Sequence, residues 1–236
     1  MKILVIGPDS EVTRLFSFLS ESGHLVQSCP DISFALQRLE YLSYNPLVFV
    51  NPEKMDPATV RGMKTAGTGE KDRAVMLIGK LPGSMKNTGG FDYVFETPPG
   101  PKDWQALMGP DGAFREKEPL DFYAAIELCD GDQNLFFDIA GIFLKDGPRR
   151  IEGLRTALAQ KSYHNVQESA HLMKGSALNL VAAPLCEATR FLESSAGKSD
   201  LTGIEDGADY VIYEYERLKN RLTRMMKERP SAEGAP

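Results

Sequence analysis

The chain falls into two halves that differ in the spacing of their apolar residues. In the first hundred residues, amphipathic stretches alternate with short apolar runs, namely KILVI, HLVQSC, PLVFV, AVMLIG and FDYVF. Such runs predict strands, and the stretches between them predict helices over 11–22, 33–44, 57–66 and 101–109. Because strands that alternate with helices form βαβ units, this half is predicted to be a doubly wound α/β domain with a five-stranded parallel sheet.

Beyond residue 118 the strand pattern gives way to helical spacing. Helical periodicity appears in six segments, 119–129, 133–145, 148–160, 164–180, 183–195 and 205–227. Pro148 is well placed for the first turn of one of these helices. The short polar breaks between segments favour antiparallel neighbours, so the second half is predicted to be an all-α four-helix bundle with extra helices.

Glycine, proline and charged residues mark the domain boundaries. The stretch GPDGAFREK at 110–118 is rich in all three and predicts a linker, whereas ERPSAEGAP at the end has little to bury and predicts a disordered tail. The predicted organisation is therefore a domain at 1–109, a linker at 110–118, a helical domain at 119–228 and a tail at 229–236.

Composition narrows the class of protein without naming its function. Hydrophobic residues make up 42% and charged residues 25%, which is typical of a soluble globular protein, and the net charge of -6 without a Lys/Arg-rich run argues against nucleic acid or an anionic membrane as partner. Cys29, Cys129 and Cys186 lack metal-binding spacing and predict reduced thiols. No apolar run reaches the length of a signal-peptide core or a membrane span, so we expect a cytoplasmic protein.

The segment AHLMKGSALNL, residues 170–180, contains the most informative helix. At about 100° per residue, one narrow stripe predicts its core-facing side and His171 lies roughly 140° from the centre of that stripe, so it is predicted to face outward. A lone histidine in a helix is most often an ordinary core or surface residue. The stripe consists of Val166, Ala170, Met173, Ala177 and Leu180.

Three neighbours give His171 a possible chemical role. Lys174 at i+3 can place an ammonium group beside any group that the imidazole carries, and Gly175 at i+4 leaves space for a partner to approach. Leu178 is predicted to be an exposed apolar docking residue, with Gln167 on the same flank. Because a neutral imidazole is a nucleophile near neutral pH, these residues suit phosphoryl transfer.

Residues 119–227 resemble the histidine-phosphotransfer (HPt) domains of two-component phosphorelays. The resemblance rests on LDFYAAIELCDGDQNLFFDIAGIFLKDGPRRIEGLRTAL, then AHLMKGSALNL and then LCEATRFLESSAGKSD, in that order. It implies a four-helix core in which His171 is the phosphoacceptor, Lys174 neutralises phosphate and Gly175 admits the partner. Glu193 matches a position that bonds the imidazole in some members. The chain departs from the pattern at Val181, where glycine is usual.

The resemblance also implies a stoichiometric phosphocarrier rather than an enzyme. Its partners would be receiver domains and a hybrid sensor histidine kinase. It would have no cofactor of its own, and Mg²⁺ would be supplied by the partner receiver during transfer.

The first half resembles a response-regulator receiver domain, which is flavodoxin-like, but it lacks the chemistry of one. An active receiver needs an acidic pair for Mg²⁺, an aspartate nucleophile, a hydroxyl residue and a lysine after successive strands. We therefore predict that this domain does not accept phosphate, although Asp9 lies next to the first of these positions. By resemblance it would position the HPt domain or form a homodimer. The positions hold Gly7 and Pro8, Asn51, Gly79, and Glu96 or Thr97.

Two other functions remain open. The protein could bind a receiver or kinase as a scaffold or inhibitor without carrying phosphate. Alternatively, the carboxyl ends of the first domain's strands could hold a small molecule. Neither VIGPDS nor GKLPG completes a nucleotide-binding motif. His164 lies about 10 Å from His171 along the helix, which is too far for a shared metal ion.

Overall fold

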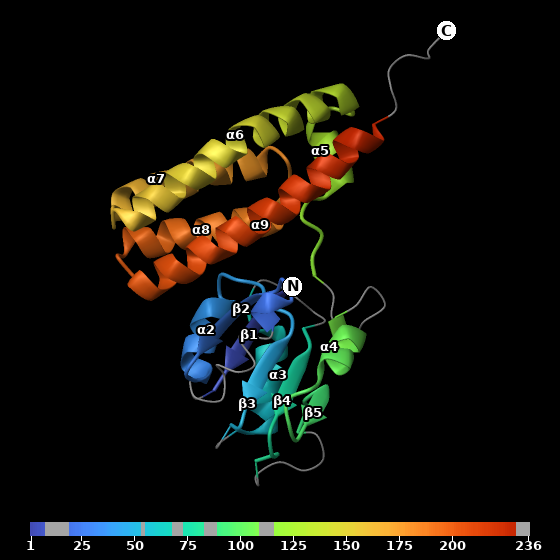
Figure 1. Ribbon diagram of the computed structural model, residues 1–236, viewed down its shortest axis with the longest axis vertical. Helices are drawn as coiled ribbons and strands as arrows, with labels where there is room; N and C mark the ends of the chain where they lie inside the picture. The colour runs from blue at the N-terminus through green and yellow to red at the C-terminus, as the bar shows by residue number, and fades with distance from the viewer. Residues whose placement is uncertain (8–18, 53–54, 68–72, 83–88, 109–115, 230–236) are drawn as a thin grey trace. The chain divides into compact units, whose positions relative to one another are not determined.

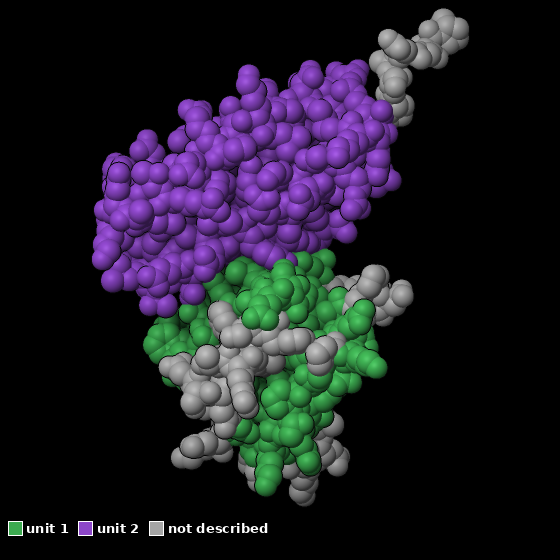
Figure 2. All heavy atoms as spheres, viewed as in Figure 1, with its two compact units in different colours: residues 1–116 green, residues 117–236 purple. Residues whose placement is uncertain are grey.

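The computed structural model describes residues 1–7, 19–52, 55–67, 73–82, 89–108 and 116–229 (Figure 1). The chain divides into two compact units, Met1–Glu116 and Lys117–Pro236 (Figure 2). Most of the predicted linker at 110–118, of the predicted tail at 229–236 and of the predicted helix at 11–22 lies outside the described residues. Each unit has its own core, and the two are described separately.

The first unit is built on a five-stranded parallel sheet, as predicted. The strand order is β2-β1-β3-β4-β5, an order found in doubly wound flavodoxin-like sheets. Every residue of β1, β3 and β4 is buried, which agrees with a parallel sheet that is covered on both faces. The strands are β1 (Lys2–Ile6), β2 (Leu25–Cys29), β3 (Leu47–Val50), β4 (Val75–Ile78) and β5 (Tyr93–Phe95).

Helices α2 (Ile32–Leu39), α3 (Pro57–Thr65) and α4 (Pro101–Met108) accompany this sheet. The predicted end of the helix at 33–44 is wrong, because α2 ends at Leu39. Pro46 disfavours helical backbone at the residue before it, and that residue, Asn45, instead donates its backbone N–H to the carbonyl of Lys2. Of the apolar residues beyond this end, Leu42 and Tyr44 are buried and Tyr41 is exposed.

The second unit is entirely helical in its described residues. It consists of α5 (Phe122–Leu128), α6 (Gln133–Ala159), α7 (Tyr163–Leu178), α8 (Ala183–Gly197) and α9 (Leu201–Glu228). In Figure 1 the long helices α6 and α9 run beside the shorter pair α7 and α8. The three-dimensional arrangement is that of a helical bundle, which confirms the predicted fold class.

The predicted break between 145 and 148 does not exist, because α6 continues through Pro148. A proline in a helix interior removes a hydrogen bond and crowds the preceding turn, so tertiary packing must offset its cost. Gly147 supplies such packing. A Cβ atom at this position would lie only 2.5 Å from the Tyr215 ring, so glycine allows α9 to approach α6 closely.

The connection between α7 and α8 turns at a residue with left-handed backbone. Val181 has a φ of 51°, a region that costs a branched side chain energy and that glycine adopts freely. The turn is closed because Ala182 donates its N–H to the carbonyl of Ala177 at 3.0 Å. Val181 stands where the HPt pattern usually has glycine. The turn between α7 and α8 forms all the same, but with a branched side chain in a strained backbone conformation.

Candidate functional site

Helix α7 presents one face to the core and the opposite face to solvent. All five residues of the predicted stripe are buried, each with at most 3% of its surface exposed. The His171 side chain, in contrast, is 64% exposed. The outward orientation predicted from helical spacing is therefore confirmed.

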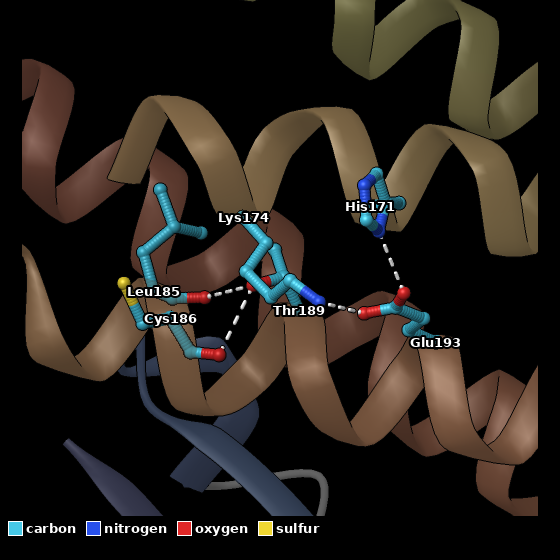
Figure 3. Close-up of polar contacts among 6 residues, drawn as sticks. All are labelled: His171, Lys174, Leu185, Cys186, Thr189 and Glu193. Carbon is cyan, nitrogen blue, oxygen red and sulfur yellow. Dashed lines mark hydrogen bonds and ion pairs between the residues drawn. The ribbon is translucent and has the colours of Figure 1, made fainter. Parts of the chain in front are cut away.

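A single carboxylate on the neighbouring helix α8 joins His171 to Lys174. Oε1 of Glu193 lies 2.8 Å from Nδ1 of His171, and Oε2 of Glu193 accepts a hydrogen bond from Nζ of Lys174 (Figure 3). The three side chains form a chain of contacts across the α7–α8 interface. The resemblance to HPt domains implied Glu193 as a partner of the imidazole, but helical spacing alone did not reveal its contact with Lys174.

The electrostatics of this cluster fix the charge of its carboxylate. Burial by itself would raise the pKa of the Glu193 carboxyl, but hydrogen bonds from Lys174 and His171 outweigh this effect and hold that pKa below its usual value. An ionised carboxylate can only accept hydrogen bonds. Nδ1 of His171 must therefore carry the proton, and in the neutral imidazole this leaves the lone pair on Nε2.

The surface around His171 is open where a partner would need to approach. A Cβ atom added to Gly175 would meet nothing within 4 Å, so the glycine is not required by packing within this unit. Leu178 is 52% exposed, as expected, and Leu172 is 54% exposed, which the sequence did not single out. Gln167 is half-buried and lies against the end of α8, near Gly197.

Other polar groups beneath the cluster are committed to the helix that carries them. The buried hydroxyl of Thr189 donates to backbone carbonyls of its own helix, those of Leu185 at 2.8 Å and Cys186 at 3.1 Å (Figure 3). Burial raises the pKa of the Cys186 thiol, so the thiolate form that a nucleophile needs is disfavoured. His171 is thus the reactive group that this part of the bundle exposes.

In the first unit, the positions that a receiver would use for chemistry lie at the carboxyl ends of the strands, except Pro8, which lies outside the described residues. Asn51 has a φ of 43° and follows β3, and its Oδ1 occupies the space that a Cβ atom on Gly79 would need. A Cβ atom on Gly7 would lie 2.7 Å from the carbonyl oxygen of Val50. The Val50 carbonyl therefore blocks a side chain at Gly7, and the Asn51 side chain together with a φ of 120° disfavours one at Gly79. Glu96 and Thr97 are exposed after β5.

Among the described residues, no group of three or more His, Cys, Asp or Glu side chains could hold a metal ion. Likewise, none of the helices in the described part of the chain is long and apolar enough to cross a membrane. The three cysteines all fall within the described residues, and each is a buried thiol outside any disulfide.

Comparisons with known proteins point to the helical unit. Among curated proteins, none matches the chain significantly. Two solved structures resemble it with a TM-score of 0.45 each. One is histidine-containing phosphotransfer protein B from Pseudomonas aeruginosa PAO1, at 19% identity over 49% of this chain and 100% of that one. The other is the HPT domain of the Hpt sensor hybrid histidine kinase from Shewanella, at 14% identity over 48% and 98%. Residues 138–227, which include His171, Lys174 and Glu193, match the family model of the Hpt domain.

Proposed function

We propose that the protein is a phosphorelay intermediary. In this proposal His171 accepts a phosphoryl group from an aspartyl phosphate on one receiver domain and passes it to an aspartate on another. The observation that carries it is the exposed imidazole whose Nδ1 is bonded to Glu193, which leaves Nε2 free to attack. The open surface at Gly175 and the match to the Hpt domain model support it further.

The transfer step follows from this geometry. Nε2 attacks phosphorus in line with the aspartyl oxygen, the Nε2–P bond forms, and the P–O bond to the donor breaks to leave a carboxylate. Since Nε2 starts with a lone pair, no proton has to leave it. The ring gains positive charge as it reacts, and the Glu193 carboxylate at Nδ1 stabilises that charge. The reverse sequence delivers the group to the next aspartate.

Lys174 neutralises the transferred group in this proposal. Its ammonium group is bonded to Glu193 in the structure, and it lies one helical turn from His171. When a phosphoryl group arrives, its oxygens offer the ammonium a stronger concentration of negative charge than one carboxylate oxygen does. We therefore propose that Lys174 moves from Glu193 to the phosphoryl group and neutralises it.

The proposed partners supply what the chain itself would not. A docking receiver domain would bring the aspartate and the Mg²⁺ ion, and a hybrid sensor histidine kinase would stand at the head of the relay. The protein would act as a stoichiometric carrier rather than an enzyme. Its first unit would not accept phosphate, since Asn51 stands in the nucleophile position and Gly7 and Gly79 leave no room for side chains; it would position the helical unit or form a homodimer.

A labelling experiment tests the proposal. Receiver domains encoded in the source genome are phosphorylated and incubated with the full chain, and the label is then followed through acid and alkali. We expect an acid-labile, alkali-stable phosphoprotein that is lost in His171→Ala. A label that survives this substitution, or no transfer from any receiver in the panel, contradicts the proposal.

A second candidate is a scaffold or inhibitor that binds a receiver or kinase without carrying phosphate. What supports it is the first unit, where Asn51 and the close surroundings of Gly7 and Gly79 leave no receiver chemistry, so that this unit would contribute by binding alone. Tight binding of a receiver by the full chain, together with an absence of transfer to or from it, would favour this candidate over the first.

A further inference from the structure

The groove between α6 and α7 contains a basic cavity beside His171. The cavity has a volume of about 210 Å³ and is lined by Arg149, Arg150, Gly153, Ser169 and Leu172. Leu172 directly follows His171 in α7, but it lines the side that faces α6, whereas His171 is bonded to α8. A protein that covers His171 by approaching the outer face of α7 therefore also comes within reach of this cavity.

Neither arginine of this cavity forms an ion pair with a carboxylate in the described part of the chain. Nη1 of Arg150 donates to the backbone carbonyl of Leu172 at 3.2 Å, which fixes the guanidinium but leaves its charge unpaired. Asp146, one helical turn before Arg150, lines the adjoining cavity of about 60 Å³ together with it, and no hydrogen bond between the two side chains is found in the described structure. This local positive charge stands out on a chain whose net charge is -6.

We propose that this cavity, named here the arginine pocket, receives one aspartate or glutamate side chain of the receiver domain that docks on His171. The proposal rests on the proposed function and adds a residue-level basis for partner choice. Guanidinium groups bind carboxylates through paired hydrogen bonds of defined geometry. Charge complementarity at an interface acts mainly on association rate and on the exclusion of wrong partners.

The size of the pocket favours a single side chain over a free ligand. Sites for small molecules occupy about 300–1,000 Å³, and the arginine pocket is smaller than that range. Gly153 contributes to the available volume, because a Cβ atom at this position would meet nothing within 4 Å. A large side chain at position 153 would therefore extend into space that the glycine leaves open.

Two substitutions test the proposal by different means. Arg149→Glu places a negative charge beside Arg150 and so cancels the net positive charge of the pocket. Gly153→Leu fills the pocket without changing its charge and replaces a poor helix former with a good one. Each has a matched control on α6. Arg155→Glu and Gly141→Leu each lie about 120° around the helix from their counterpart, line neither cavity, and the added Cβ at Gly141 also meets nothing within 4 Å.

The measurement is the second-order rate of phosphoryl transfer between the full chain and each receiver domain of the source genome. To separate docking from reactivity, each rate is divided by the rate at which the small donor phosphoramidate labels His171 in the same variant. We expect Arg149→Glu and Gly153→Leu to lower the normalised rate at least about tenfold at low salt, and both controls to stay within about twofold of the wild type.

The partner's side of the contact gives the decisive comparison. In a receiver whose transfer slows with Arg149→Glu, each acidic surface residue is replaced by arginine in turn. One of these receiver variants should recover the transfer rate when it is paired with the Arg149→Glu protein. If wild-type transfer occurs and neither pocket variant changes it, the arginine pocket proposal is wrong and the proposed function stands. If the wild type exchanges phosphate with no receiver, the proposed function fails and the pocket proposal fails with it.

Discussion

At the scale of single residues, Glu193 controls the proposed chemistry because it touches both His171 and Lys174. Helical spacing was sufficient to place His171 outward and to place Lys174 and Gly175 next to it, since these relations lie within one helix. The contact with Glu193 crosses two helices and depends on how α7 and α8 pack, which spacing along one helix does not determine. Resemblance to a family supplied that partner for the imidazole.

The tautomer of His171 should depend on Glu193. We expect nitrogen NMR spectra of the wild type to show a protonated Nδ1, and Glu193→Ala to lose this preference, because no carboxylate then accepts from Nδ1. Labelling of His171 by phosphoramidate should slow about tenfold in this variant, as is typical when a residue that orients a reactive group is removed. Glu168→Ala, an exposed residue of α7, is the control. Equal tautomer populations in the wild type and Glu193→Ala would contradict the assignment.

The stability contributed by Glu193 should depend on pH. Its pKa is lower in the folded chain than the ordinary value of 4.5, so the ionised form stabilises the folded state. This stabilisation is fully present above about pH 4.5 and is lost as the pH falls through the folded-state pKa. Urea unfolding of the wild type and Glu193→Gln should therefore show a gap at pH 6 that narrows by pH 3.5. A gap that widens on acidification would contradict the sign of the pKa shift.

Gly175 should matter to a partner and not to the fold. A side chain at this position meets nothing within 4 Å, and leucine is a better helix former than glycine by somewhat under 1 kcal/mol. We expect Gly175→Leu to unfold at the same or a higher urea concentration than the wild type. Its rate of transfer from a phosphorylated receiver, divided by its rate with phosphoramidate, should fall at least about tenfold. Loss of stability in Gly175→Leu would show instead that the glycine serves the bundle.

At the scale of elements, apolar spacing predicted the strands of the first unit and the helices α7 and α8 because each has a clear period and a nearby stop signal. It failed where packing overrode a local signal. Pro148 predicts the first turn of a helix, yet α6 continues through it. The close packing of Gly147 against Tyr215 of α9 offsets the cost of the proline. The apolar residues after Leu39 predict a longer helix, yet Leu42 and Tyr44 are buried in the non-helical segment that leads to Pro46.

The turn after α7 offers a direct test of strain. Val181 adopts a φ of 51°, and left-handed backbone costs a residue with a side chain roughly 1–2 kcal/mol. Val181→Gly removes this cost but gains freedom in the unfolded chain, so we expect a net stabilisation of about 0.5–1 kcal/mol. Urea unfolding of the full chain measures it. Val181→Ala, which keeps a Cβ atom, should give little of the gain, and a destabilised glycine variant would show that the valine side chain contributes more by packing.

At the scale of the whole molecule, two units with separate cores differ in what their surfaces can do. The parallel sheet of the first unit keeps the strand order of doubly wound folds, while Gly7 and Gly79 have no room for side chains in the folded unit. The second unit exposes a histidine with an oriented imidazole. The fold class was predictable for both units, but the crowding at Gly7 and Gly79 was not, because it arises between strand ends that are distant in the sequence.

An aspartate placed at residue 51 should not create a phosphate acceptor in the first unit. We expect Asn51→Asp in a His171→Ala background to remain unlabelled by phosphoramidate or acetyl phosphate. Adding Gly79→Thr should lower stability rather than create activity, because its side chain overlaps residue 51 and its φ of 120° disfavours any side chain. Alkali-labile label on residue 51 would contradict this expectation.

The contact of Asn51 with Gly79 has a consequence for how much signal the proposed relay can store. A chain with a working acceptor in each unit could hold two phosphoryl groups and exchange them internally. If Asn51 keeps the first unit from accepting phosphate, as proposed, each molecule would hold one group at most. The cellular amount of the protein would then set an upper limit on the phosphate in transit, and a cell could adjust the strength of its response through expression level alone.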